Sequence, residues 1–270
     1  MQNGSAYQQG KGNSKNEQAR EDISTIFNSV FQVEMATSQE AINEVFEVRY
    51  QVYCIDRSFE NPSCFPDNRE HDSYDPRSSH ALIRHRKTGH SVATVRLVMA
   101  GNHPEQADFP MEAPCLHRMS RRAREAVAGA RRDQIAEISR MAVSREFRRR
   151  LNEQNTVSGV SETACYKDAE KGKRAVPYIS LGLFAAILQM SVRHNITHWM
   201  AVMEPAQLRL LKRFGVEFDH VGPVLEYHGL RRPAFTEAAS LIDRIEKRRP
   251  DVWSLITDDG HYLPARPDIP

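Results

Sequence analysis

The sequence has no long apolar run. No stretch approaches the roughly 20 consecutive apolar residues that a membrane-spanning helix needs. The N-terminal residues also lack the apolar core of a secretory signal. These absences lead us to expect a cytoplasmic protein.

Cysteine is scarce, and neither sign of charge dominates. The 270 residues include four cysteines, and no two of them have the C-x-x-C spacing of metal or redox sites. The formal net charge is only +2, which provides no global field that would attract nucleic acid. We therefore expect reduced, inert thiols, no metal site and no nucleic-acid partner, and we look instead at local runs of arginine.

What is present is typical of a folded domain. Hydrophobic residues make up 40% of the chain and charged residues 27%, as in ordinary globular proteins. The first 25 residues are rich in Gln, Asn, Gly and Ser and bury too little apolar surface to offset the entropy of ordering. We expect a disordered leader over residues 1–28, one domain over 29–236, and a C-terminal helix and tail over 237–270.

Hydrophobic periodicity predicts mixed helices and strands in the first half of the chain. A strand over 31–36 precedes a helix from Thr37, where Thr37 and Glu40 have the spacing of a capping box. Strands over 80–86 and 91–99 are joined by "KTGH", a hairpin signal. A helix around 121–132 and a strand over 136–143 follow.

The second half continues the alternation and sets the fold class. Residues 151–177 are weakly patterned and resemble an insertion, while Pro205 suits the first position of a helix that Gly215 closes. The other expected elements are a buried helix over 179–195, a strand over 197–203, short strands over 216–222 and 225–235, and a helix over 237–248. This order predicts an α+β domain with a mixed central sheet flanked by helices.

Arg49 is the most informative single residue. On a helical wheel it lies among Val45, Phe46, Val52 and Tyr53, near the middle of the apolar face. A buried arginine is costly unless a carboxylate pairs with it. Two interpretations stay open: a structural ion pair, or a side chain that reaches from the core wall into a cavity.

A proline-terminated loop supplies candidate partners. "REHDSYDPRSSH" contains the carboxylates of Glu70, Asp72 and Asp75, without the glycine and distal glutamate of a calcium-binding loop. Arg96 lies within the strand "SVATVRLVM", where it could form a salt bridge at a sheet edge. Solvated turns of this composition are common, so the loop by itself is a weak signal.

The segment "AEISRMAVSREFRRR" starts as a strand and ends in charge. Glu137 and Arg140 are three residues apart, which in an ideal strand places them on opposite faces. Either they act separately, or a β-bulge brings both to one side. A bulge would also free backbone N–H groups that could bind a developing oxyanion.

Together these segments resemble one family. Arg49, "EHDSYD", "VATVRLV" and "EISRMAV" occur in the order found in acyl-homoserine lactone synthases. The chain is more similar to their relatives, the long-chain N-acyl amino acid synthases and the acyltransferases of PEP-CTERM/exosortase systems. "RYQVYCIDRSFE", "HDSYDPRSSHAL" and "FPME" resemble the last group, and the resemblance spans roughly residues 31–232.

The resemblance implies a GNAT-like fold and a set of site residues. It implies an acyl thioester donor on the phosphopantetheine of acyl carrier protein or CoA, an amine acceptor, and no bound cofactor. It assigns catalysis to Glu137, Arg140 and Arg96, and acceptor binding to Arg49, Asp72 and Asp75. The tryptophan that lactone synthases place between the helix and the acidic loop is absent, and Phe59 and Phe65 are the aromatic residues there.

The end of the strand is expected to hold the donor. Where acetyl-CoA enzymes surround a pyrophosphate with glycine-loop amides, this chain has arginines, which suit both a phosphate and an acidic carrier protein. The basic segment 117–132 either extends that surface or is a plain solvated helix. The expected donor-binding residues are Val143, Arg145, Arg148, Arg149 and Arg150.

The sequence therefore predicts an N-acyltransferase that joins a fatty acyl group to the α-amine of an amino acid. Glu137 would accept the ammonium proton, because only the free amine attacks a thioester. The alternatives are an acyl-homoserine lactone synthase, an acetyl-CoA enzyme, and a non-catalytic module that binds acyl carrier protein in an export system. Peripheral membrane association and the oligomeric state stay open.

Overall fold

The protein is built around a mixed seven-stranded sheet. The structure, a computed structural model, describes residues 22–101, 108–145, 147 and 175–267. The strand order is β1-β2-β3-β4-β5-β7-β6, and only β4 and β5 run parallel. The strands are β1 (Phe31–Met35), β2 (Ser78–His85), β3 (Ser91–Met99), β4 (Ile135–Val143), β5 (His198–Met203), β6 (Leu225–Glu226) and β7 (Leu230–Glu237).

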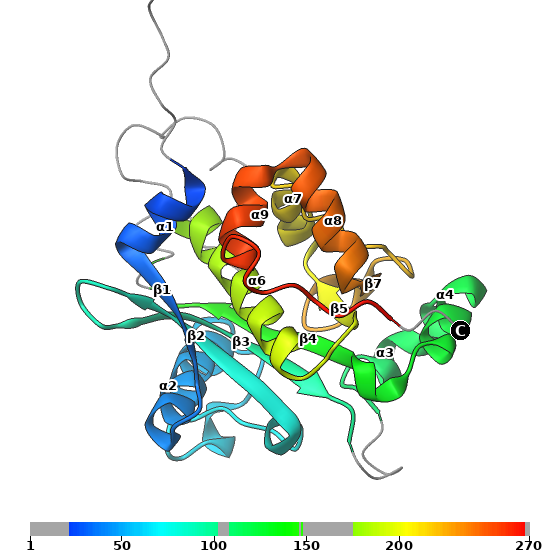
Figure 1. The fold of residues 1–270 in the computed structure, drawn as a ribbon. Helices are drawn as coiled ribbons and strands as arrows, with labels where there is room; N and C mark the ends of the chain where they lie inside the picture. The colour runs from blue at the N-terminus through cyan, green and yellow to red at the C-terminus, as the bar shows by residue number, and fades with distance from the viewer. Residues whose placement is uncertain (1–21, 102–107, 146, 148–174, 268–270) are drawn as a thin grey trace, which may run out of the picture.

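Helices cover both faces of this sheet. The long helix α6 lies across one face with α1, α7, α8 and α9, and α2 lies on the other (Figure 1). The helices are α1 (Ile23–Val30), α2 (Gln39–Arg49), α3 (Glu112–Cys115), α4 (Arg121–Gly129), α6 (Ala175–Arg193), α7 (Pro205–Arg213), α8 (Ala238–Arg248) and α9 (Pro250–Thr257). Among the described residues, no helix combines the length and the apolar character needed to cross a membrane. The α+β class expected from the sequence is confirmed.

The main core lies between the sheet and α6. This helix is apolar on all sides, as expected of a helix enclosed by neighbours, and its Phe184 contacts Trp199 of β5 edge to face. The indole N–H of Trp199 donates a 2.8 Å hydrogen bond to the Ser191 hydroxyl, which satisfies the polar atom of this buried ring. The core therefore fixes β4 and β5 from one side.

Both ends of the expected domain differ from the structure. The last residues assigned to a disordered leader form most of α1, whose Phe27 ring lies so close to Gly182 of α6 that a Cβ there would be 2.4 Å from it. The expected C-terminal tail contains the additional helix α9, which buries Val252 and Ile256 in the main core. Both segments are polar overall, so their composition does not indicate these helices. A few apolar residues are enough to hold a short helix when they pack against the main core. The rest of the leader, residues 1–21, lies outside the described residues, as does most of the expected insertion.

Smaller corrections concern the ends of elements. Ser38, and not Thr37, is the N-cap of α2, and its hydroxyl accepts a 3.2 Å hydrogen bond from Ala41 N–H. The expected strand over 216–222 is reduced to a single bridge between His220 and Ala234. The expected strand over 225–235 is a hairpin, because His228 and Gly229 have positive φ and reverse the chain between β6 and β7.

Strands β4 and β5 separate in the middle of the sheet. They pair only from Ile135 opposite His198 to Ile138 opposite Ala201, although both strands continue beyond this point. The gap between diverging parallel strands is a place where an extended ligand can reach backbone groups that no neighbouring strand occupies. The candidate site lies at this separation.

Candidate active site

A buried network of charged side chains joins α2, the acidic loop, β3 and β4. Arg49 donates from Nε to Glu70 Oε2 at 2.6 Å and from Nη1 to Asp75 Oδ1 at 2.7 Å. Arg96 donates from Nη1 to Asp72 Oδ1 at 2.6 Å and to Asp75 Oδ1 at 2.8 Å. The loop that looked unspecific in the sequence is therefore held by two arginines from separate elements.

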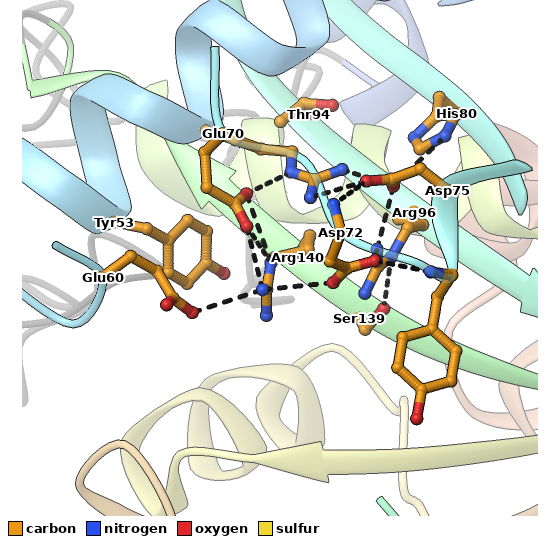
Figure 2. Close-up of polar contacts among 12 residues, drawn as sticks. Tyr53, Glu60, Glu70, Asp72, Asp75, His80, Thr94, Arg96, Ser139 and Arg140 are labelled. Carbon is orange, nitrogen blue, oxygen red and sulfur yellow. Dashed lines mark hydrogen bonds and ion pairs between the residues drawn. The ribbon is translucent and has the colours of Figure 1, made fainter. Parts of the chain in front are cut away.

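Arg140 completes the network from β4. Its Nη2 lies 2.9 Å from Glu70 Oε1 and 3.3 Å from both Asp72 Oδ2 and Glu60 Oε1. Figure 2 shows Arg140 at the centre of these three carboxylates, with the Tyr53 ring beside it. The structure thus brings together the predicted site residues Arg49, Asp72, Asp75, Arg96 and Arg140. It also pairs Arg49 with Glu70, one of its candidate partners from the sequence, and adds Glu60.

Burial divides the network into an inner and an outer part. The side chain of Arg49 has 0% exposure, Glu70 1% and Asp75 7%. Of the outer side chains, Arg140 is 17% exposed and Asp72 26%. The Arg49 side chain does not reach into an open cavity, because its guanidinium group is enclosed and paired. Of the two interpretations of Arg49 from the sequence, the structure shows the buried ion pair.

The charges of the network set its protonation states. Burial acts to raise the pKa values of Glu70, Asp72 and Asp75, but the neighbouring arginines outweigh burial and hold all three below their usual range. Burial and the charge of Arg49 lower the pKa of His80 to about 4. The network therefore has three cationic arginines facing four carboxylates, with a neutral histidine, and carries one net negative charge at neutral pH.

A β-bulge in β4 confirms one of the two alternatives for Glu137 and Arg140. Arg96 pairs with Ser139 and Thr94 with Ala142, so Val95 alone opposes Arg140 and Met141. Arg140 has a φ of +48°, a left-handed conformation that non-glycine residues rarely adopt. Such a backbone outlier persists only where its surroundings enforce it, and here the salt bridges of Arg140 do so.

Glu137 is the acid–base candidate on the same strand. It is 4% exposed, and its Oε2 accepts a 2.8 Å hydrogen bond from Met111 N–H. Burial raises its pKa to about 8, although this hydrogen bond and the charge of Arg96 oppose the rise. A carboxyl group poised near neutral pH is the kind of group that general acid–base catalysis uses.

A pocket opens where β4 and β5 separate. Residues from both strands, the π-helical turn Tyr50–Asp56, α7 and β7 line it. Its volume of about 410 Å³ includes space that is open to solvent. The lining residues are Tyr53, Ile138, Ser139, Arg140, Met141, Val202, Met203, Glu204, Gln207 and Arg231.

The donor-binding candidates can be placed only in part. Val143 is buried at the end of β4, where it belongs to the main core and has no surface to offer a ligand. Arg145 is half exposed, and its Nη1 lies 3.7 Å from Asp56 Oδ1 at the end of the π-helical turn. Arg148, Arg149 and Arg150 lie outside the described residues.

Several pocket residues were not predicted as site residues. Tyr53 follows Arg49 by four positions, a spacing that could have marked it, and it reaches the pocket from a π-helical turn, a feature frequent at functional sites. Glu204, Gln207 and Arg231 come from segments whose pattern indicated only surface helix and strand. Across the described part of the chain, no group of His, Cys, Asp and Glu side chains could hold a metal ion.

Comparison with known proteins defines the fold. The acetyltransferase (GNAT) domain family matches residues 48–157. Two solved structures resemble the chain at 16% and 18% identity: TofI with an inhibitor and MTA, and BjaI, a CoA-dependent acyl-homoserine lactone synthase with SAM and isopentyl-CoA. Their TM-scores are 0.54 and 0.51; TofI covers 80% of this chain and 96% of its own, and BjaI 87% and 90%.

A further solved structure is FeeM, an N-acyl amino acid synthase from uncultured soil microbes. It is 12% identical, with a TM-score of 0.50, and the match covers 79% of this chain and 93% of FeeM. No curated protein sequence matches the chain. At such identities the likeness concerns the fold, which is GNAT-like, with a mixed sheet that opens between β4 and β5.

Proposed function

We propose that the protein is an N-acyltransferase that moves a fatty acyl group from a phosphopantetheine thioester to the α-amine of an amino acid. The observation that carries this proposal is Glu137, a buried carboxyl with a pKa of about 8 on the strand that borders the pocket. The GNAT fold and the separation of β4 and β5 support it. The donor would be an acyl carrier protein or CoA thioester.

The outer carboxylates suit an amine. Asp72 and Glu60 keep 26% and 29% exposed side chains beside Arg140, and the network carries one net negative charge. Arg140, which contacts both carboxylates, lines the pocket, so an ammonium group bound beside Arg140 would lie near them. Glu137 would then take one ammonium proton, directly or through water, which leaves the lone pair that attacks the thioester carbonyl.

The remaining steps follow from the same geometry. The new C–N bond forms a tetrahedral intermediate whose oxyanion backbone N–H groups near the bulge at Arg140 would stabilise. Collapse of this intermediate breaks the C–S bond, and the second amine proton passes to the departing thiolate. No covalent enzyme intermediate is involved, since burial raises the pKa of Cys54 to about 11 and leaves it a poor nucleophile.

The test is product analysis with defined substrates. The full chain is incubated with dodecanoyl-CoA, or with dodecanoyl acyl carrier protein, and the twenty standard amino acids, and N-acyl products are identified by mass spectrometry. We expect one or a few N-dodecanoyl amino acids that are absent with Glu137→Gln. A product that forms only with S-adenosylmethionine would instead support lactone synthesis, and no product with either donor would contradict the proposal.

A further inference from the structure

The arginines of the buried network already pair with carboxylates of the chain itself. Arg49 and Arg96 are enclosed, and their donors are directed to Glu70, Asp72, Asp75 and the Ser139 hydroxyl. Arg140 is directed to three carboxylates. An amino acid would nevertheless bring a carboxylate together with its amine, and burying that charge without a cationic partner is costly.

Arg57 is a further arginine, and two of its donor atoms are not used. Its Nε and Nη2 atoms are buried and have no hydrogen-bond partner among the described residues. It follows directly after the π-helical turn that brings Tyr53 to the pocket. Buried donors are nearly always satisfied in folded proteins, by protein, water or ligand, so a guanidinium left in this state is a candidate for binding an anion.

Arg231 and Glu204 form an ion pair in the pocket. Arg231 Nη1 lies 2.8 Å from Glu204 Oε1, and both side chains line the pocket. Burial lowers the pKa of Arg57, while the charges of Glu204 and Asp56 oppose this change. Because Asp56 also pairs with Arg145 at 3.7 Å, the three arginines Arg57, Arg145 and Arg231 accompany two carboxylates, and this set carries one formal net positive charge.

The network and this second set of charges are thus opposite in sign. Tyr53 is close to both, because it lines the pocket together with Arg231 and its ring centroid lies 5.2 Å from the Arg140 guanidinium. An ammonium group suits the network, with its surplus of carboxylate, and a singly charged anion suits Arg57 and Arg231. A phosphate dianion fits less well, because Glu204 would repel its second charge.

We propose that Arg57 and Arg231 form the subsite for the acceptor's carboxylate, so that the enzyme selects amines that also carry a carboxylate. This inference rests on the proposed N-acyltransferase function. Arg57 would donate hydrogen bonds to the carboxylate from Nε and Nη2, and Arg231 would pair with both the ligand and Glu204. Both are specificity-determining residues and take no part in bond formation.

The experiment compares the best acceptor among the twenty amino acids with its carboxamide, using dodecanoyl-CoA as donor. The ratio of the two kcat/KM values is measured in wild type, Arg57→Gln, Arg57→Lys and Arg231→Gln. Each ratio is compared between proteins, which cancels the difference in amine basicity. As a matched control, Arg248→Gln removes an exposed arginine that pairs with Glu217 and does not line the pocket.

We expect wild type and the control to prefer the amino acid over the carboxamide. Arg57→Gln should reduce this preference by about 10-fold or more, the value of a charge-assisted hydrogen bond, through a higher KM for the amino acid alone. Arg57→Lys should restore part of it, and Arg231→Gln should act in the same direction as Arg57→Gln. Retained carboxamide turnover shows that each variant is folded.

Other outcomes would overturn the inference. Equal use of both acceptors by wild type would reject the subsite while N-acyl transfer stands. If Arg57→Gln lowers kcat/KM equally for both acceptors, Arg57 either has a structural role or binds the donor. A loss that disappears when dodecanoyl-pantetheine, which lacks phosphate, replaces dodecanoyl-CoA would assign Arg57 to the donor phosphate. If wild type acylates no amine, the proposed function fails, and the subsite with it.

Discussion

Replacing Arg49 with methionine should destabilise the protein strongly. Arg49 is fully buried, and its guanidinium contacts Glu70 at 2.6 Å and Asp75 at 2.7 Å. Methionine preserves helix α2 and fills much of the same space. It also leaves two carboxylates that burial penalises and that have lost their nearest cation.

The size of the effect follows from the remaining partners. Removing one member of a buried ion pair typically costs about 3–5 kcal/mol. Glu70 keeps Arg140, and Asp75 keeps Arg96 and the Asp72 N–H, so we expect the lower end, about 3 kcal/mol. For a domain of this size each kcal/mol lowers Tm by roughly 2–4 °C, which gives a fall of about 6–12 °C.

Thermal and urea unfolding of purified Arg49→Met measure this change. The control is Arg69→Met, which removes an arginine that is 35% exposed and pairs with the exposed Glu47; it should lose at most about 1 kcal/mol. Adding Asp75→Asn to Arg49→Met removes one uncompensated carboxylate, so the double variant should lose less than the sum of the single changes. A Tm for Arg49→Met within 2 °C of wild type would refute the buried ion pair as a source of stability.

Three further predictions concern catalysis, the donor and acid. Glu137→Gln should lower turnover by about 100-fold or more and should weaken the rise in kcat/KM that we expect of the wild type as pH increases through about 8, the pKa to which burial raises Glu137; an unchanged pH profile would exclude Glu137 as the base. Replacing Arg148 and Arg149 with Glu should weaken reaction with acyl carrier protein far more than with acyl-pantetheine, and wild-type activity should fall with salt because exposed charges are screened over roughly 10 Å at 0.1 M; equal losses with both donors would contradict carrier docking. Because the pKa values of Glu70, Asp72 and Asp75 are lowered in the folded state, their stabilisation is present above the ordinary carboxyl pKa of about 4 and is lost as pH falls below it. Asp75→Asn should therefore reduce the acid sensitivity of urea unfolding, and an identical slope in the variant would contradict this assignment.

The sequence determined most of the elements and the nature of the network. Alternating hydrophobic residues located β2 to β5, and an arginine on the apolar face of a helix indicated a buried charge with a carboxylate partner. Such patterns can be recognised in a sequence because burying an unpaired charge, or exposing an apolar stripe to water, costs free energy locally. The pairing of Arg49 with Glu70 and Asp75 follows from the same cost once the two segments meet.

The tertiary structure decided what each charge does. The spacing of Glu137 and Arg140 allowed two arrangements, and the bulge opposite Val95 selects one through contacts with residues up to 80 positions away in sequence. Whether Arg49 reaches a cavity depended on how closely the loop covers it, which no local pattern records. Tyr53 and Arg231 are 178 positions apart, and they line one pocket because of the order of strands in the sheet. Electrostatic environment is a property of three-dimensional neighbours. For this reason the sequence identified most residues of the buried network, while the fold assigned their partners and added the pocket residues Glu204, Gln207 and Arg231.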